Sequence, residues 1–168
     1  MIENIEVTAV SGDEELDYDW ITDRLALGGA IYTRRNMGIL ARAAVTHIIN
    51  LQAGFDDSQI AQGTGIQVEW APCVDDLQPK PPELFAKAIG FAIEAWQNPD
   101  SKIYFHCVEG ARRSPMMLLA FLGAQGMMLT EAMELISSRR PKAEFPAVYR
   151  QSVVRFLARY RGQLSKGM

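Results

Sequence analysis

The sequence has little of several features that would direct a functional assignment elsewhere. Its 168 residues include only two cysteines and two histidines. Two cysteines cannot form the disulfide scaffold of a small secreted domain. Neither histidine lies in a His, Cys or carboxylate spacing typical of a metal site. We therefore expect no metal and no cofactor.

Long apolar runs and an excess of positive charge are also missing. No apolar run approaches the roughly 20 residues that a membrane-spanning helix needs. The N-terminal segment is acidic, whereas an export signal begins with a basic region followed by an apolar core. The formal net charge of −3 gives no general attraction to nucleic acid. We expect neither a membrane span nor a nucleic-acid partner.

What is present fits one globular domain. Hydrophobic residues make up 48% of the chain and charged residues 22%, which is ordinary for a folded protein. Short apolar segments alternate with amphipathic ones, a pattern that favours an α/β architecture. We predict a single domain at residues 20–162, with a central, mostly parallel sheet flanked by helices on both faces. Residues 1–19 form an acidic N-terminal leader in which an edge strand can lie.

The boundaries of the expected elements follow from apolar periodicity and from proline, glycine and capping residues. We predict strands at residues 5–10, 25–29, 47–51, 67–70 and 102–106, and helices at residues 35–43, 82–97, 115–125, 130–139 and 146–160.

The most informative segment is residues 106–114, His-Cys-Val-Glu-Gly-Ala-Arg-Arg-Ser. It follows an apolar segment that predicts a buried strand and precedes one that predicts a helix. A strand, a tight loop and a helix N-terminus together form an anion site, because loop amides point inward and the helix dipole adds positive charge. Gly110 can adopt the positive φ that such a loop needs.

The residue types in this loop indicate nucleophilic chemistry on a phosphate. Cys107 sits where a thiolate is stabilised, and Arg113 can hold two phosphate oxygens in a bidentate fork. Ser114 places a hydroxyl next to the sulfur and can stabilise the thiolate as it leaves. His106, at the end of a strand, is better placed to orient the loop by hydrogen bonding than to act as a base. The plainer alternative is that Cys107 is a buried structural thiol.

This segment resembles the His-Cys-x5-Arg-Ser/Thr signature of the cysteine-based protein tyrosine phosphatase superfamily. Residues 24–30, residues 45–51 and the segment Pro72-Cys-Val-Asp75, followed by Phe85 and Phe91, are similar to the dual-specificity phosphatases and occur in the same order. The resemblance covers about residues 20–160. It implies a dual-specificity-phosphatase-like fold and metal-independent hydrolysis of phosphomonoesters through a cysteinyl phosphate.

The resemblance also implies a role for each site residue. Cys107 is the nucleophile and Ser114 assists its departure, while Asp75 serves as general acid and then as base, with His106 in a supporting role. Matching Pro72 and Phe85 to the family pattern selects Asp75 over Asp76. The residues expected to bind the phosphoryl group are Val108, Glu109, Gly110, Ala111, Arg112 and Arg113.

Substrate and location follow less directly. The expected partner is a phosphorylated protein carrying phosphotyrosine, phosphoserine or phosphothreonine, or another phosphomonoester, and a nucleophilic thiol suits a reducing, cytoplasmic compartment. The alternatives are a phosphoinositide or RNA 5′-phosphatase, a sulfurtransferase or arsenate-reducing enzyme, and a non-catalytic phosphate-binding module.

Two further features have competing interpretations. Cys73 either forms a regulatory disulfide with Cys107 or is buried as a small hydrophobic residue, and we favour burial. Arg139 and Arg140 either form a solvated helix end that suits the helix dipole or part of a basic rim for the substrate, and we favour the first.

Overall fold

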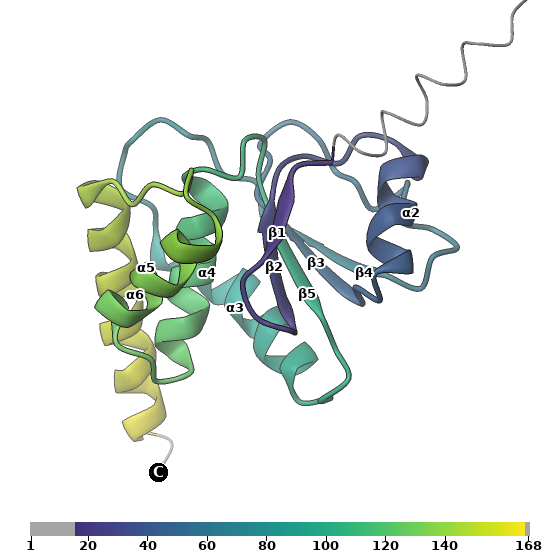
Figure 1. The fold of residues 1–168 in the computed structure, drawn as a ribbon. Coiled ribbons are helices and arrows are strands. Elements are labelled where there is room, and N and C mark those ends of the chain that lie inside the picture. Colours follow the sequence, from purple (N-terminus) through teal and green to yellow (C-terminus); the bar gives the residue numbers. More distant parts are fainter. Residues whose placement is uncertain (1–15, 167–168) are drawn as a thin grey trace, which may run out of the picture.

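Five short strands form a mixed sheet in the computed structural model, which describes residues 16–166 (Figure 1). Across the sheet the order is β1 (Tyr18–Trp20), β2 (Leu25–Gly28), β5 (Ile103–His106), β3 (His47–Asn50) and β4 (Gln67–Trp70). Only β1 runs antiparallel to its neighbour, and the other strands are parallel. The sheet is therefore mostly parallel, as predicted.

The register brings the carboxyl ends of the parallel strands to one level. His106 at the end of β5 pairs with Gly28 of β2 on one side and with Asn50 of β3 on the other. Asn50 in turn pairs with Trp70, the last residue of β4. The loops that follow all four strands thus leave the same edge of the sheet, where ligands bind in open α/β sheets.

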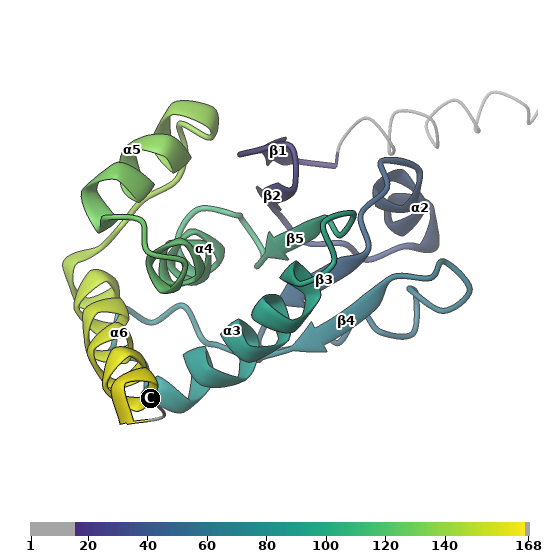
Figure 2. The ribbon, with the colours of Figure 1, turned by 90° about the horizontal axis from the view of Figure 1, so that it is seen from below.

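Helices cover both faces of the sheet, as the sequence predicts. Helix α2 (Arg34–Arg42) packs alone on one face, whereas α3 (Pro82–Trp96), α4 (Arg113–Ala124), α5 (Leu129–Arg139) and α6 (Ala147–Lys166) lie on the other (Figure 1). α3 and α4 contact the strands directly, and α5 and α6 pack against α4 (Figure 2).

Alternating strand residues divide the core between these two faces, because successive side chains of a strand point in opposite directions. One cluster joins the sheet to α2, and its strand members are Ala26, Ile48 and Tyr104. The larger cluster joins the sheet to α3 and α4, and its buried strand members are Leu25, Leu27, Ile49, Ile103 and Phe105.

The helix that follows the cysteine loop is the most buried element. Every residue of α4 from Arg113 to Gly123 is buried, because α3, α5 and α6 surround it (Figure 2). The N-terminus of α4 therefore has little freedom to move relative to the end of β5.

Local sequence signals account for several helix starts. Thr33 caps α2 by accepting a hydrogen bond from the Asn36 backbone N–H at 3.1 Å. Pro82 begins α3, where the amide hydrogen that proline lacks would have no partner within the helix.

The predicted elements between residues 25 and 139 agree with the observed ones to within two residues at each end. The predicted strand at residues 5–10 lies outside the described residues, and strand β1 at Tyr18–Trp20 was not predicted as such. Helix α6 continues to Lys166, past its predicted end at Tyr160, because no proline follows to stop it. The domain boundaries at 20 and 162 stay a prediction. Within residues 16–166, no helix is long and apolar enough to cross a membrane.

Two helical glycines provide a test of the packing around α4. A Cβ at Gly123 would lie 2.6 Å from Leu157 Cδ1, whereas a Cβ at Gly90 of α3 would meet no atom within 4 Å. We expect Gly90→Ala to raise the free energy of unfolding by about 0.5–1 kcal/mol through helix propensity. Gly123→Ala should lower it by about 1 kcal/mol, because overpacking outweighs the gain in propensity. Denaturant unfolding measures the free energy of unfolding of both variants. Equal stabilisation by the two substitutions would show that the Leu157 side chain can move without a cost in packing.

Candidate active site

The loop between β5 and α4, residues 107–112, curls at the carboxyl edge of the sheet. Cys107 lies at its base and is only 2% exposed. The Gly110 backbone N–H donates to Cys107 Sγ at 3.3 Å, and Ser114 Oγ lies 3.3 Å from the same sulfur. The predicted neighbours of the cysteine are therefore brought together around it, and we call this loop the cysteine loop.

Glycine is required at position 110 for two reasons. Its φ of 66° is in the left-handed region that residues with a Cβ disfavour. A Cβ at this position would also lie 2.5 Å from the carbonyl carbon of Gly28, so the cysteine loop packs directly on the end of β2. An alanine at this position would have to adopt an unfavourable φ, and its Cβ would have to displace the Gly28 backbone.

One nitrogen of the Arg113 guanidinium group is hydrogen-bonded to backbone carbonyls, and another has no hydrogen-bond partner among the described residues. Its Nη1 donates to the Cys73 carbonyl at 2.7 Å and, more weakly, to the Leu51 carbonyl at 3.4 Å. Its Nε is buried and has no hydrogen-bond partner among the described residues. Because buried N–H groups are nearly always paired, this unpaired donor is suited to a ligand oxygen.

The remaining residues of the cysteine loop lie on its rim. Val108 and Glu109 are exposed, so the Glu109 carboxylate points into solvent. Arg112 is partly exposed, and its Nε lies 3.3 Å from Asp75 Oδ2 and 3.9 Å from Glu144 Oε1. The carbonyl of Ala111 accepts a hydrogen bond from the Glu144 backbone N–H.

A buried hydrogen-bonded chain supports the strand end from behind. His106 Nε2 lies 2.7 Å from Asp57 Oδ2, and both side chains are fully buried. Asn50 Nδ2 donates to Asp57 Oδ1 at 3.1 Å, which ties the end of β3 to the end of β5. No local signal in the sequence points to Asp57, because an aspartate shortly after Gly54 and Phe55 is also typical of a solvated turn.

The two neighbouring aspartates have different partners. Asp75 Oδ1 accepts a hydrogen bond from the Tyr149 hydroxyl at 2.8 Å, and Oδ2 contacts Arg112 of the cysteine loop. Asp76 pairs instead with Lys80 Nζ at 2.6 Å, and this hydrogen bond lowers the pKa of Asp76. Of these two carboxylates, Asp75 alone contacts the cysteine loop in the part of the chain that the structure describes.

Arg140 is not at a solvated helix end, and that interpretation of the sequence is wrong. Its side chain is fully buried, and its Nε and Nη2 donate to the carbonyls of Gly110 and Glu109 at 2.8 and 3.1 Å. It also pairs with Asp17 and Asp19 at the start of the sheet, at 2.9 Å each. The buried position is explained by these partners, which lie far away in the sequence.

Both cysteines are free thiols. Cys73 is 4% exposed, and burial raises the pKa of its thiol to about 11. It is therefore packed as a small hydrophobic residue, as favoured above, and a disulfide with Cys107 stays the less favoured alternative. No group of three or more His, Cys, Asp or Glu side chains within residues 16–166 could hold a metal ion.

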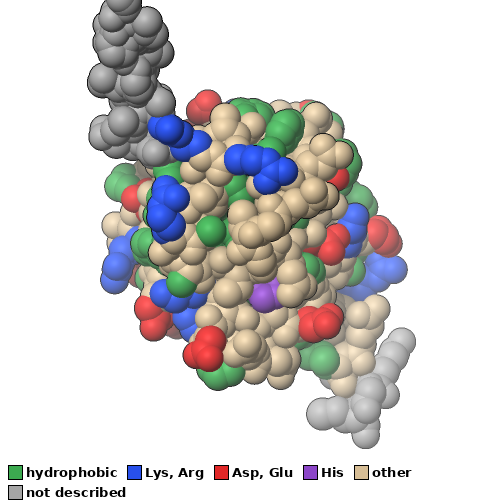
Figure 3. Space-filling model, turned by 90° about the vertical axis from the view of Figure 1, so that its right-hand side faces the viewer, with side chains coloured by type: hydrophobic (Ala, Val, Ile, Leu, Met, Phe, Trp, Pro, Cys, Tyr) green, Lys and Arg blue, Asp and Glu red, His purple; other side chains and the backbone are tan. Residues whose placement is uncertain are grey.

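One hollow adjoins the cysteine loop. Its lining includes Tyr32, Gln52, Phe55, Val108 and Arg113, and Tyr32 and Phe55 pack edge to face. Charges of both signs are scattered over the face of the molecule in Figure 3, with no continuous area of one sign.

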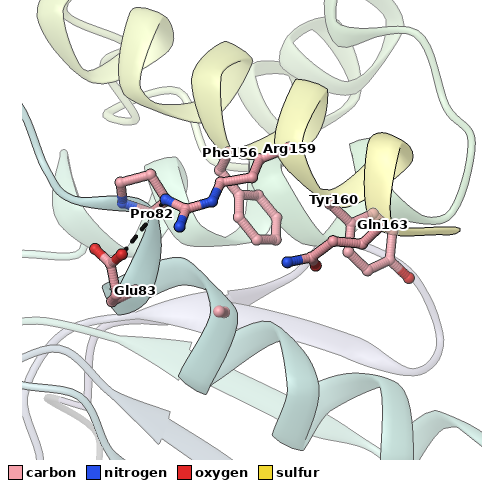
Figure 4. Close-up of a pocket in the computed structure, with 7 residues that line it drawn as sticks. Pro82, Glu83, Phe156, Arg159, Tyr160 and Gln163 are labelled. Carbon is pink, nitrogen blue, oxygen red and sulfur yellow. Dashed lines mark hydrogen bonds and ion pairs between the residues drawn. The ribbon is translucent and has the colours of Figure 1, made fainter. Parts of the chain in front are cut away.

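A second hollow lies away from the cysteine loop, between α3 and α6. Figure 4 shows Phe156, Tyr160 and Gln163 of α6 facing the start of α3, with the Arg159–Glu83 ion pair across its mouth. None of the predicted site residues lines this hollow.

Comparisons with known proteins agree with this geometry. A family model described as the catalytic domain of dual specificity phosphatases matches residues 31–157. Dual specificity protein phosphatase 13B of the mouse is 27% identical over 121 residues, which cover 69% of this chain and 61% of that protein. The match thus spans about three fifths of the length of this relative.

Solved structures share the fold. PTPMT1 in complex with PI(5)P superposes with a TM-score of 0.77 at 18% identity, covering 88% of this chain and 98% of that one. Human DUSP28 superposes with a TM-score of 0.71 at 22% identity, covering 86% and 99%. The predicted fold class is confirmed.

The Arg140 contacts predict a pH-dependent stability. Hydrogen bonding to Arg140 lowers the pKa of Asp17 below 3.8, so the stability from this pair is present above pH 3.8 and is lost as the pH falls through the folded-state pKa. Arg140→Met should lower the free energy of unfolding at pH 7 by about 2 kcal/mol or more, because two loop carbonyls lose their partner. This difference in the free energy of unfolding between Arg140→Met and the unsubstituted protein, the deficit, should become smaller in acid.

Denaturant unfolding across pH measures this deficit against the matched variant Arg139→Met. Arg139 precedes Arg140 and is exposed, so its replacement should have little effect. A deficit for Arg140→Met that is the same at pH 7 and in acid would show that the acidic partners contribute nothing.

Proposed function

The chain belongs to the dual-specificity phosphatase family of cysteine-dependent phosphatases, and we propose that it hydrolyses phosphomonoesters through a cysteinyl phosphate formed on Cys107. The observation that carries the proposal is the environment of the sulfur. A backbone N–H and a serine hydroxyl both lie 3.3 Å from Cys107 Sγ, at the base of a loop that Arg113 completes. Hydrogen-bond donors around sulfur favour the thiolate, which is the nucleophilic form.

In the first step the thiolate attacks phosphorus, and the bond from phosphorus to the leaving oxygen breaks as the S–P bond forms. Arg113 Nε and Nη2 bind the phosphoryl oxygens with the loop amides, because Nη1 is already held by backbone carbonyls. Asp75 transfers its proton to the leaving oxygen. The alcohol or phenol then departs neutral.

In the second step water hydrolyses the cysteinyl phosphate. Asp75, now a carboxylate, accepts a proton from the water as its oxygen attacks phosphorus. The S–P bond breaks, and the Ser114 hydroxyl donates a hydrogen bond to the departing thiolate. Inorganic phosphate leaves, and neither step uses a metal or a cofactor.

A phosphorylated protein is the substrate that we propose first. The mouse relative is named a protein phosphatase, and the hollow beside the cysteine loop suits a side chain that bears one phosphate. Its lining is aromatic and amide, with Arg113 as its one cationic residue. The exposed Tyr32 ring can pack against a substrate side chain.

A phosphoinositide is the second candidate, because PTPMT1, which shares the fold, was solved with PI(5)P bound. Turnover of a phosphotyrosine peptide and of short-chain PI(5)P in one assay separates the two substrates. A higher kcat/KM for the lipid would replace the first candidate by the second.

Sulfur transfer and arsenate reduction are less consistent with the site. Neither reaction has a use for a carboxylic acid fixed beside the loop, and Asp75 is held there by two contacts. A binding module without turnover would not need a cysteine whose sulfur accepts hydrogen bonds at the base of the loop.

The roles of Cys107 and Arg113 predict different kinetic defects. Cys107→Ser should abolish turnover but keep inorganic phosphate binding, because the loop amides and Arg113 remain while the nucleophile becomes a hydroxyl. Arg113→Lys should lower kcat by about 10²–10³-fold and weaken phosphate binding as well, since the fork contacts both ground state and transition state. Steady-state kinetics with chelator present, and calorimetric titration with phosphate, measure both. Turnover by Cys107→Ser at the rate of the unsubstituted enzyme would contradict the mechanism.

The assignment of Asp75 predicts a dependence on the leaving group. Asp75→Asn should lower kcat/KM for phosphoserine peptides by about 10²-fold or more, because an alkoxide needs a proton to depart. The loss should be much smaller for p-nitrophenyl phosphate, whose leaving group is already stable as an anion. Asp76→Asn is the matched control, since Asp76 pairs with Lys80. A larger loss from Asp76→Asn would reverse the assignment.

A further inference from the structure

The two carboxylate oxygens of Asp75 are held from different sides. Oδ2 lies toward the cysteine loop, where Arg112 Nε contacts it at 3.3 Å. Oδ1 lies toward α6, where the Tyr149 hydroxyl donates to it at 2.8 Å. The contact with Arg112 is long, and the Arg112 side chain is 37% exposed, whereas Tyr149 is only 1% exposed. The hydrogen bond from Tyr149, on the side away from the proposed phosphate site, is therefore the firmer of the two contacts.

The Tyr149 hydroxyl also sets the backbone that carries the aspartate. It accepts a hydrogen bond from the Leu77 backbone N–H at 3.1 Å. Leu77 has a φ of 58°, which a leucine adopts only when the surroundings hold it there. One hydroxyl thus fixes both the side chain of Asp75 and the turn two residues later.

A second contact from α6 holds the other end of this segment. Ser152, one helical turn after Tyr149, accepts a hydrogen bond from the Lys80 backbone N–H at 2.9 Å. Lys80 Nζ donates back to the Val74 carbonyl at 2.6 Å, which closes residues 74–80 into a compact loop. The loop therefore takes its position from α6 and carries Asp75 with it.

Tyr149 remains a donor throughout the neutral range. Burial raises the pKa of its hydroxyl to about 12, so the group stays protonated where the enzyme would work. Asp75 Oδ1 can accept this hydrogen bond whether the carboxyl group is ionised or carries its proton on Oδ2. The contact can therefore persist through both steps of the reaction.

We propose that Tyr149 is a positioning residue for the general acid, holding Oδ1 of Asp75 so that Oδ2 carries the transferred proton. This inference rests on the role proposed above for Asp75. Arg112 plays the complementary part, because it pairs with Oδ2 when the carboxylate is ionised and leaves that oxygen when the proton returns. Tyr149 acts through Asp75 and touches neither the phosphate nor the leaving group.

The test removes the hydroxyl and keeps the ring. Tyr149→Phe should lower kcat/KM for phosphoserine peptides by about tenfold, a fraction of the whole contribution of a general acid. For p-nitrophenyl phosphate the loss should stay below about twofold, since little proton transfer is needed. The inhibition constant for inorganic phosphate should not change, because the cysteine loop is intact. 4-Aminophenylalanine at position 149, which restores a donor, should recover the phosphoserine activity.

Two controls separate positioning from a general loss of structure. Tyr160→Phe removes a hydroxyl from the same helix at a position lining the hollow in Figure 4, and it should leave both activities unchanged. Adding Tyr149→Phe to Asp75→Asn should cause no further loss on either substrate, because the hydroxyl then has no acid to position. Thermal unfolding of each variant reports folding separately.

Four results would overturn the inference. Equal losses on the two substrates, or a further loss in the Asp75→Asn background, would show that Tyr149 acts on the fold. Full phosphoserine activity in Tyr149→Phe, while Asp75→Asn shows its expected defect, would reject Tyr149 and leave the proposed mechanism standing. An Asp75→Asn variant with no dependence on the leaving group would reject both the acid assignment and the role of Tyr149.

Discussion

The cysteine loop must bring the Gly110 amide to the sulfur of Cys107 and still satisfy the carbonyls on its outer side, and much of the surrounding structure serves this requirement. Each outward carbonyl has a donor: Val108 from the Ala30 amide, Glu109 and Gly110 from Arg140, and Ala111 from the Glu144 amide. Because an unpaired carbonyl away from water is costly, these donors stabilise this loop conformation in the absence of an anion. The proposed anion site is therefore supported largely from outside the loop, and Arg140 contributes two of these hydrogen bonds.

Other side chains of the proposed site are also held by hydrogen bonds from elsewhere in the fold. His106 is held by Asp57, Arg113 by the carbonyls of Cys73 and Leu51, and Asp75 by Tyr149. In each case the supporting atom lies on a different element from the residue it holds. The geometry that brings the proposed nucleophile, the guanidinium group and the proposed acid together thus belongs to the packed domain, and preorganisation of this kind lowers the cost of reaching a transition state.

Much of the fold could be predicted from the sequence, because its signals are local. The alternation of apolar strands with amphipathic helices, Pro82 at the start of α3 and Gly110 in the cysteine loop each act within a few residues. Strand β1 escaped prediction because three residues are too few to show a period. Arg140 was misplaced because an arginine at a helix end is usually solvated, and its acidic partners lie more than 120 residues away.

Local sequence is enough to single out Cys107 as the proposed nucleophile, together with the Arg113 guanidinium group and the loop that joins them. Residues 107–114 are contiguous, and a strand, a tight turn and a helix leave that loop little conformational freedom. The groups that hold these residues come together only in the folded domain, where Asp57 lies behind His106, Arg140 outside the loop and Tyr149 beside Asp75. These partners are separated by 30 to 74 residues. No local pattern encodes such pairs, because packing of whole elements, and not the spacing of neighbours, sets which buried polar groups meet.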